Sequence, residues 1–481
     1  MLTVLGSPRR CCDGITRRES LRAGAITALG GLGLPHLLAA EQAGQLDAAK
    51  AKNVIMLFLL GGAATQDMYD MKPDGPSETR GEFRPIPTTV PGVQVCEHLP
   101  RTAQLMHKIA LVRSVTHQAG CHNTLPTYTG LEMPVVDNTV TSASFPPSMG
   151  SVCEYLRVNQ HGDDGGLPDY VYMPTYLGWG QAIRRAGPYG GFLGKRYDAL
   201  TTECMPHLAE GVPTPSPGSP QVPHGMPKLP ASEPLDGLTL DRLRSRRSLQ
   251  TQFTDGVRRV VDSGRTDSFD RNYGRAFNLL TSANLQSAFT LDEESPETRD
   301  RYGRSLFGQC TLIGRRLIEQ GVRFVNVTWD LFWGPVNIDY DAWDTHRNNF
   351  AILKDNKLPG FDQTYSALIE DLDQRGLLDE TLVVVTSEMG RTPRINGNSG
   401  RDHWTNCYGS MFAGGGIRGG VVHGASDAQA AYVKDAPVST SDICATVYHC
   451  LGIRPEMRVP DATGRPVEVA HGGHPIDGIL A

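Results

Sequence analysis

The feature that most constrains the fold of this chain is a run of seven apolar residues, VIMLFLL at residues 54–60, which follows Asn53 and ends in Gly61-Gly62. A strand with one face in water alternates apolar and polar residues, whereas a short, uniformly apolar run that glycine terminates predicts a strand buried on both faces. Such strands lie at the centre of parallel sheets that helices cover on both sides. The run therefore predicts an α/β fold.

Further strands and helices are predicted along the rest of the chain. The predicted strands are residues 109–115, 322–328 and 381–387, with shorter ones at 409–413 and 421–422. The predicted helices are residues 238–261, 271–319 and 361–374, and a last helix that Ser441-Asp442 caps and that runs to Leu451 before Gly452. Strands that alternate with helices predict a doubly wound, mainly parallel sheet flanked by helices, with helical and loop insertions.

The N-terminal residues match a bacterial export signal. Arg17-Arg18 are followed by a weakly apolar stretch, residues 23–40, which ends in the small residues Ala39-Ala40. This order of features is typical of a twin-arginine signal, although a short amphipathic helix is the alternative. We therefore expect residues 1–43 to engage the twin-arginine export machinery and the mature chain to reach the periplasm or the cell surface. Because this route carries folded proteins, often with a cofactor inserted, it favours a bound metal.

The remaining chain is predicted to form one domain, residues 50–481, with two insertions. The Pro- and Ser-rich residues 211–234 predict an extended surface loop, and residues 235–320 predict a helical insertion. No later stretch approaches roughly 18 apolar residues, so no stable membrane span is expected in the mature chain. The formal net charge of −6 does not suggest a nucleic-acid footprint, so no nucleic-acid partner is expected.

Side chains of the kinds that bind metals follow four of the predicted strands. Ligands of an open α/β sheet bind beyond the carboxyl ends of its strands. The residues found there are Asp67 and Asp70, then His117, Cys121, His122 and Asn123, then Asp341, Asp344 and His346, and then Glu388, Arg391, Asp402 and His403. Each alone fits a turn cap or a salt bridge, but their joint placement predicts a site for a divalent metal, with Asp341 and Asp402 orienting the imidazoles.

Six short motifs occur in order between residues 53 and 404. They are NVIMLFLLGG at 53–62, KPD at 72–74, RGEF at 80–83, WDTH at 343–346, EMGRTP at 388–393 and GRDHW at 400–404. Together they resemble the exported bacterial family catalogued as domain of unknown function 1501, which is grouped with the alkaline phosphatase and sulfatase superfamily. The resemblance implies an alkaline phosphatase-like α/β sandwich around one or two metals that hydrolyses phosphate or sulfate esters.

The resemblance also implies a set of metal ligands. Asp344 and His346 are similar to an Asp and a His ligand of the superfamily, and His403 is similar to its late histidine. Glu388 resembles the acid of an Asp-His ligand pair, although Met389 stands where the histidine is usual. Imidazole and carboxylate ligands suit zinc, manganese or iron, and we expect zinc or manganese rather than calcium.

Two departures from the superfamily pattern concern the first strand and the nucleophile. Gly61-Gly62 replace the carboxylate at the end of the first strand, so Asp67 or Asp70 would have to reach back to the metal. The position of the superfamily's Ser, Thr or modified Cys nucleophile, counted back from Thr129-Gly130, is Gly120. Cys121, Thr124 or a water activated by the metal remain the alternatives.

The neighbouring polar residues have predicted roles in binding and proton transfer. Asn123 falls where related phosphodiesterases hold a phosphate-binding Asn. Arg391 is predicted either to hold the anion through its fork of N–H groups or to form a salt bridge with Glu388. His122 or His117 is predicted to protonate the leaving oxygen, with a structural role as the alternative.

Two functions are therefore considered. The first is a metal-dependent hydrolase of phosphate or sulfate esters that acts outside the cytoplasm on small-molecule or polysaccharide-borne anionic esters. The alternative is a metal-stabilised binding or structural protein, which Gly120 and Met389 favour. An oxidoreductase is not predicted, because Gly414-Gly415-Gly416 lacks the spacing of a dinucleotide fingerprint. The residues at the strand ends favour the hydrolase.

Overall fold

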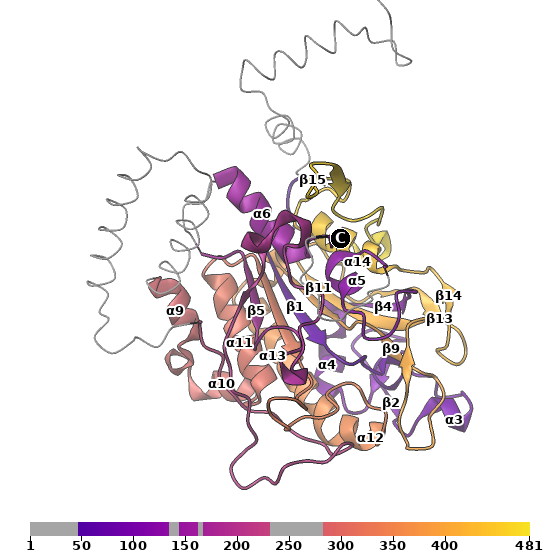
Figure 1. Ribbon diagram of the computed structural model, residues 1–481. Helices are drawn as coiled ribbons and strands as arrows, with labels where there is room; N and C mark the ends of the chain where they lie inside the picture. The colour runs from indigo at the N-terminus through magenta and orange to yellow at the C-terminus, as the bar shows by residue number, and fades with distance from the viewer. Residues whose placement is uncertain (1–46, 134–143, 162–166, 231–281) are drawn as a thin grey trace, which may run out of the picture.

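The computed structural model describes residues 47–133, 144–161, 167–230 and 282–481 (Figure 1). The predicted export signal and the predicted helix at 238–261 lie outside these residues. The chain forms a central eight-stranded sheet in the order β12-β4-β11-β8-β1-β7-β5-β6. The apolar run is β1 (Asn53–Leu59), which lies inside the sheet, and all of its residues except Asn53 are buried. The prediction of a central strand is confirmed.

The other strands of this sheet include every strand that the sequence predicts. They are β4 (Ile109–Val115), β5 (Tyr170–Met173), β6 (Leu200–Thr201), β7 (Phe324–Trp329), β8 (Thr381–Thr386), β11 (Tyr408–Gly414) and β12 (Val422–His423). Strand β1 pairs in parallel with β7 and β8, while β11 is antiparallel to both β4 and β8. The sheet is therefore mainly parallel, as predicted.

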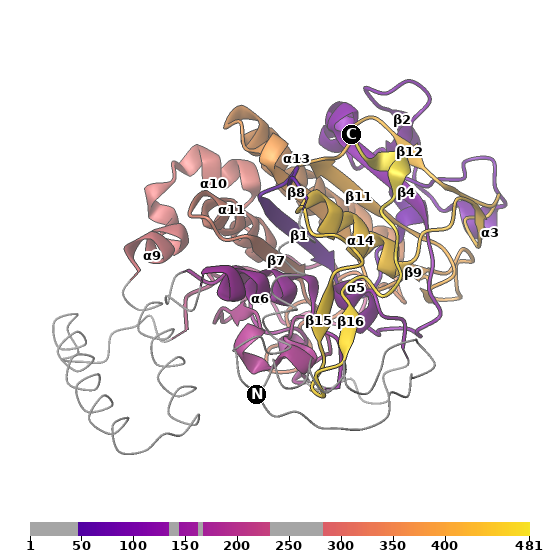
Figure 2. The same ribbon diagram turned by 90° about the horizontal axis from the view of Figure 1, so that it is seen from above.

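Helices cover both faces of the sheet (Figure 2). One layer holds α4 (Pro100–Leu105), α10 (Pro296–Tyr302), α11 (Leu306–Glu319) and α13 (Leu358–Gln374). The other holds α5 (Leu125–Thr129), α6 (Met149–His161) and α14 (Thr440–Cys450). In the first layer α11 packs against β7 and β1, and in the second α6 packs against β5 and β7. The doubly wound α/β prediction is confirmed.

Three predicted helices have different ends from those expected, and α13 begins at Leu358, three residues before its predicted start. The described part of the 271–319 helix consists of three helices, α9 (Ala283–Phe289), α10 and α11, because each begins after a serine that caps it. Helix α10 also ends at Gly303, which has a φ of 88°. Helix α14 is capped by Ser439, not by Ser441, since Ser439 and Asp442 form a reciprocal capping box.

Shorter elements surround the sheet. They are α3 (Ser77–Arg80), α12 (Asn349–Ile352) and the antiparallel pairs β2 (Pro85–Pro87) with β3 (Gln94–Cys96), β9 (Gly390–Arg391) with β10 (His403–Trp404), β13 (Ala425–Ser426) with β14 (Val433–Asp435), and β15 (Arg458–Pro460) with β16 (Pro466–Glu468). Residues 211–230 contain no helix and only isolated bridges. Among the described residues, no helix has the length and apolar character that crossing a bilayer requires.

Candidate metal centre

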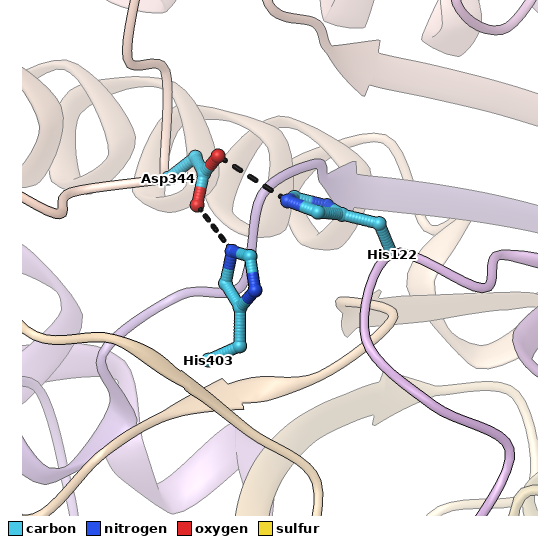
Figure 3. Close-up of side chains that lie close together, drawn as sticks. All are labelled: His122, Asp344 and His403. Carbon is cyan, nitrogen blue, oxygen red and sulfur yellow. Dashed lines mark hydrogen bonds and ion pairs between the residues drawn. The ribbon is translucent and has the colours of Figure 1, made fainter.

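Three imidazole rings converge on the carboxylate of Asp344, and Figure 3 shows two of them, those of His122 and His403. The Nε2 atom of His122 lies 3.3 Å from Asp344 Oδ2, and the Nε2 atom of His403 lies 3.0 Å from Oδ1. The Nε2 atom of His346 lies 3.1 Å from the same Oδ1. Ligand atoms of His122, Asp344 and His403 all lie within 4.8 Å of one another. Three nitrogens of one chemical type therefore face one carboxylate.

Two of these rings have a second carboxylate behind them. The Nδ1 atom of His122 lies 3.1 Å from Glu388 Oε1, and the Nδ1 atom of His346 lies 2.8 Å from Asp402 Oδ1. A carboxylate at the far nitrogen fixes the tautomer and the orientation of a metal-binding imidazole. Glu388 and Asp402 therefore hold the Nε2 atoms in place. Asp402 has the orienting position that the sequence predicts.

The ends of β1 and β8 bring the segments of the centre together. The backbone N–H of Gly61 donates to Glu388 Oε1 at 2.9 Å. Gly61 has a φ of 111°, and a Cβ atom there would lie only 2.5 Å from the backbone nitrogen of Asp344. The absence of a side chain at this strand end therefore lets the Asp344 loop approach β1. The pairing of β9 with β10 places His403 opposite Arg391.

The carboxylates and imidazoles shift each other's pKa values. Burial raises the pKa of Asp344, but the hydrogen bonds from three histidines and the charge of Arg391 outweigh burial and hold this pKa well below its usual range. Burial lowers the pKa of His122, but its hydrogen bonds to Asp344 and Glu388 outweigh burial and raise it to about 9. The pKa of His403 is lowered, mainly by burial. The carboxylates are therefore ionised at neutral pH.

Arg391 lies beneath this cluster and has no exposed surface. Its Nη2 atom donates to Asp344 Oδ1 at 2.5 Å, while its Nε and Nη1 atoms have no hydrogen-bond partner among the described residues. Of the two predicted roles, the structure shows a salt bridge, formed with Asp344 and not with Glu388. Because the guanidinium is buried, its contact is with the carboxylate that the imidazoles share and not with a molecule in solvent.

The donor set and the charge of the cluster fit a divalent metal. Imidazole nitrogens together with a carboxylate are ligands of zinc, manganese or iron, whereas calcium takes oxygen ligands. With neutral imidazoles, the carboxylates of Asp344, Glu388 and Asp402 and the guanidinium of Arg391 leave two net negative charges. A divalent cation balances them. In the described part of the chain, His122, Asp344 and His403 form the group whose ligand atoms are close enough to share an ion.

Two predicted carboxylates lie in other interactions. Asp67 is buried, and its two oxygens accept hydrogen bonds from the Nε and Nη2 atoms of Arg401, each at 2.7 Å. Asp70 accepts from Lys72 Nζ at 2.9 Å and from the hydroxyl of Ser426. Neither has a contact with the three imidazoles among the interactions of the described residues. The structure therefore gives Asp67 a buried ion pair in place of the predicted metal contact, because Arg401 already neutralises its charge.

Two predicted residues of the preceding loop are used to hold that loop. The Thr124 hydroxyl is buried and donates to the carbonyl oxygen of Ala186. The Asn123 side-chain amide donates to the carbonyl oxygens of Ala119 and Met133 at 3.0 and 2.8 Å, and its oxygen accepts from the backbone of Leu125. The predicted nucleophile Thr124 and the predicted phosphate ligand Asn123 are thus both engaged with protein groups.

The remaining residues of this loop have different environments. Cys121 is exposed, and partial desolvation raises the pKa of its thiol above the usual value, which disfavours the nucleophilic thiolate. His117 donates through Nε2 to the carbonyl oxygen of Glu388 at 2.7 Å, and its Nδ1 accepts from a backbone N–H. These bonds match the structural alternative for His117. His122, predicted as an acid, instead points its Nε2 atom at Asp344, and its only signal in the sequence is its place after the second strand.

A cavity of about 310 Å³ lies beside the centre. Its lining includes Asp344 and His346 together with Pro217, Trp333, Tyr340, Asp341 and Arg347. Because Asp344 and His346 belong to both features, a molecule in this cavity would contact the centre directly. Predicted as a residue that orients an imidazole, Asp341 instead accepts from the backbone N–H of Gly218 at 2.6 Å.

Comparisons with known proteins give one family match and distant structural matches. Residues 51–480 match the family described as Protein of unknown function (DUF1501). The comparison with curated protein sequences gave no match. Similar solved structures include the PsFucS1 sulfatase from Pseudoalteromonas sp., with 14% identity, a TM-score of 0.36 and coverage of 91% of this chain and 72% of that one.

Two further structures have similar scores. The lipoteichoic acid synthase LtaP from Listeria monocytogenes has 12% identity, a TM-score of 0.33 and coverage of 91% of this chain and 78% of that one. The phosphonate monoester hydrolase SpPMH from Silicibacter pomeroyi has 12% identity, a TM-score of 0.34 and coverage of 88% and 78%. Overlaps this loose carry no weight for the reaction, which depends on the side chains of this chain.

Proposed function

The chain belongs to the family of proteins of unknown function DUF1501, and we propose that it is a metal-dependent hydrolase of phosphate or sulfate esters. The observation that carries this proposal is the convergence of three Nε2 atoms on Asp344 beside a cavity. A structural metal site is closed by four protein ligands, whereas a catalytic one keeps a position for water or substrate. The contact of Asp344 and His346 with the cavity supports an accessible position.

A divalent metal bound by His122, Asp344 and His403 would keep a position for water or substrate, and it would polarise an ester oxygen and lower the pKa of a water molecule. The chain's own residues prepare this site. Glu388 and Asp402 fix the rings of His122 and His346, and Arg391 fixes the carboxylate of Asp344. Such preorganisation means that the ligands need little rearrangement during the reaction.

Water is the proposed nucleophile. The Thr124 hydroxyl is buried in a hydrogen bond, and the pKa of the Cys121 thiol is raised, so neither side chain is prepared to attack. In the proposed reaction, water attacks the phosphorus or sulfur atom and the bond to the ester oxygen breaks. The products are an alcohol, which takes up one proton, and the inorganic anion.

Elemental analysis of the purified protein tests the metal site. We expect tightly bound zinc or manganese in the wild type, loss of the metal in His403→Ala, and retention in His449→Ala, which alters an exposed histidine outside the centre. Equal metal content in all three proteins would contradict the proposed ligand set. The proteins are then assayed with 4-nitrophenyl phosphate, bis(4-nitrophenyl) phosphate and 4-nitrophenyl sulfate.

A second candidate function is a metal-stabilised binding or structural protein. The observation that favours it is the absence of a prepared side-chain nucleophile in the described loop at residues 120–124. Metal-loaded protein that binds such esters but turns over none of them would support this second function. Turnover that His403→Ala abolishes and His449→Ala leaves unchanged would support the hydrolase.

We further propose that residues 1–43 direct export through the twin-arginine machinery to the periplasm or cell surface. The support is the pair Arg17-Arg18 before the weakly apolar stretch at 23–40. Replacement of both arginines by lysine is expected to retain the protein in the cytoplasm. The same replacement at Arg9-Arg10 is the matched control and is expected to leave export unchanged. Cell fractionation and immunoblotting measure where each variant is found. Export of the Arg17-Arg18 variant would contradict the proposed twin-arginine signal.

A further inference from the structure

The cavity beside the metal centre has two aromatic rings in its wall. Trp333 is 38% exposed, and its ring centroid lies 5.3 Å from that of Tyr340, with the two planes at 51°. An indole ring in a cavity wall offers a large apolar face and a polar N–H against which a ligand can pack. Among the chain's five tryptophans, all of which the structure describes, Trp333 is the exposed one. The aromatic surface therefore lies where a ligand of the centre would pass.

The Pro-rich segment also lines this cavity, through Pro217. The backbone N–H of Gly218 donates to Asp341 Oδ2 at 2.6 Å, and the Asn348 side chain donates to the Gly218 carbonyl oxygen at 3.1 Å. These two bonds fix Pro217 against the loop that carries Asp344. The cavity is thus lined by two segments, Pro217 and residues 333–347, which the hydrogen bond between Gly218 and Asp341 connects.

Polar groups without protein partners also line the cavity. Asp341 Oδ1 has no hydrogen bond, and the exposed guanidinium of Arg347 has no hydrogen bond or ion pair, within the described ranges of the chain. One is a free acceptor and the other a set of free donors. Aromatic faces, a carboxylate and a guanidinium together match a ring that carries apolar C–H faces and several hydroxyl groups. A purely apolar ring would leave both charged groups without a partner.

We propose that this cavity is a subsite for a sugar ring, and that the chain acts on esters carried by sugars. The inference rests on the proposed function, because the ester must reach the metal centre while the ring lies against Trp333. In this arrangement Trp333 and Tyr340 pack against the ring, while Asp341 and Arg347 bind its hydroxyl groups. Trp333 and Arg347 then determine specificity without taking part in the reaction.

Binding to metal-free protein tests the subsite separately from the reaction. The ligands are galactose 6-sulfate, glucose 6-phosphate and, as a nucleotide competitor, adenosine monophosphate. We expect the two sugar esters to bind the wild type saturably in calorimetry and to change its tryptophan fluorescence. Trp333→Ala is expected to weaken sugar-ester binding about tenfold, and Tyr432→Ala, which removes an exposed aromatic ring outside the cavity, is expected to bind like the wild type. Circular dichroism confirms that each variant is folded.

Activity measurements form the second arm. With metal-loaded protein, Trp333→Ala is expected to lower kcat/KM about tenfold for a sugar-borne ester, whereas Tyr432→Ala, outside the cavity, is expected to leave it unchanged. Sugar binding that depends on Trp333, without any turnover, would support the subsite and overturn the hydrolase. Turnover of nitrophenyl esters without sugar binding that depends on Trp333 would support the hydrolase and overturn the subsite. Binding of adenosine monophosphate alone through Trp333 would overturn the inference of a sugar ring.

Discussion

Gly61→Ala should displace Asp344 and empty the metal centre. Gly61 stands at the end of β1 with a φ of 111°, and a Cβ atom there would lie 2.5 Å from the backbone nitrogen of Asp344 and 2.8 Å from its Cβ. Both neighbours belong to a packed loop, so they cannot move aside as the tip of a flexible side chain can. The added methyl group must therefore push the Asp344 loop away from the three imidazoles.

The magnitude follows from two separate costs. An alanine with positive φ costs about 1–2 kcal/mol relative to glycine. Overpacking of a buried position costs about 1–3 kcal/mol more. The free energy of unfolding should therefore fall by about 2–5 kcal/mol. Because a metal ligand is displaced, metal affinity should also fall at least about tenfold.

Gly194→Ala is the matched control, because Gly194 has a φ of 101° and an added Cβ there would meet nothing within 4 Å. It carries the backbone cost without the collision. Urea denaturation gives the free energy of unfolding, and calorimetry with zinc gives the affinity. We expect Gly194→Ala to lose about 1–3 kcal/mol and to bind zinc like the wild type. If Gly61→Ala matched Gly194→Ala in both measurements, the reasoning about the approach of Asp344 to β1 would be refuted.

Three further predictions concern protons and buried charges. Metal binding through Nε2 requires a neutral His122 ring, and the pKa of His122 is about 9. The affinity for zinc should therefore fall by up to about tenfold for each pH unit between pH 9 and pH 7. Chelator competition measures this affinity, and a value that does not change with pH would contradict the prediction. Burial raises the pKa of Asp330 to about 7, so its contribution to stability is full below about pH 4 and is lost as the pH rises through 7. The Tm of Asp330→Asn relative to wild type should therefore increase between pH 4 and 8, and a constant difference would disprove the assignment. Lys357→Met should lower the free energy of unfolding by about 3–5 kcal/mol, because it leaves the buried carboxylate of Asp339, 2.5 Å from Lys357 Nζ, without its cation. Adding Asp339→Asn should recover part of this loss in urea denaturation. If the costs of the two substitutions simply added, the ion pair would not be the cause.

Much of the fold could be predicted because the signals are local. Strand β4 has the predicted ends, and β1 differs by one residue, since a buried strand reveals itself in a continuous apolar run. Strand β5, YVYM, is buried throughout but has only four residues, and it is not among the strands that the sequence predicts. The 271–319 pattern was predicted as one helix, because the serine caps and Gly303 that divide its described part were outweighed by its periodicity.

The candidate site could be predicted by residue type but not by role. Asp344, His346, Glu388 and His403, which follow two different strands of the sheet, do lie together in the structure. Their roles depend on which atom of each side chain faces the shared carboxylate. The sequence has no signal for which atom faces the carboxylate. It also has no signal for the ion pair between Arg401 and Asp67, the residue predicted as a metal ligand.

By itself, the sequence determined the alternation of strands and helices and the collection of metal-ligand residues at the strand ends. Both follow from short-range periodicity and from the rule that parallel strands end at a common edge. Only the tertiary structure decided that His122 faces the centre, that Glu388 stands behind it and that Pro217 closes a cavity beside it. Those arrangements depend on contacts between segments that are more than a hundred residues apart. The spacing of residues along the chain does not tell which way their side chains point in such contacts.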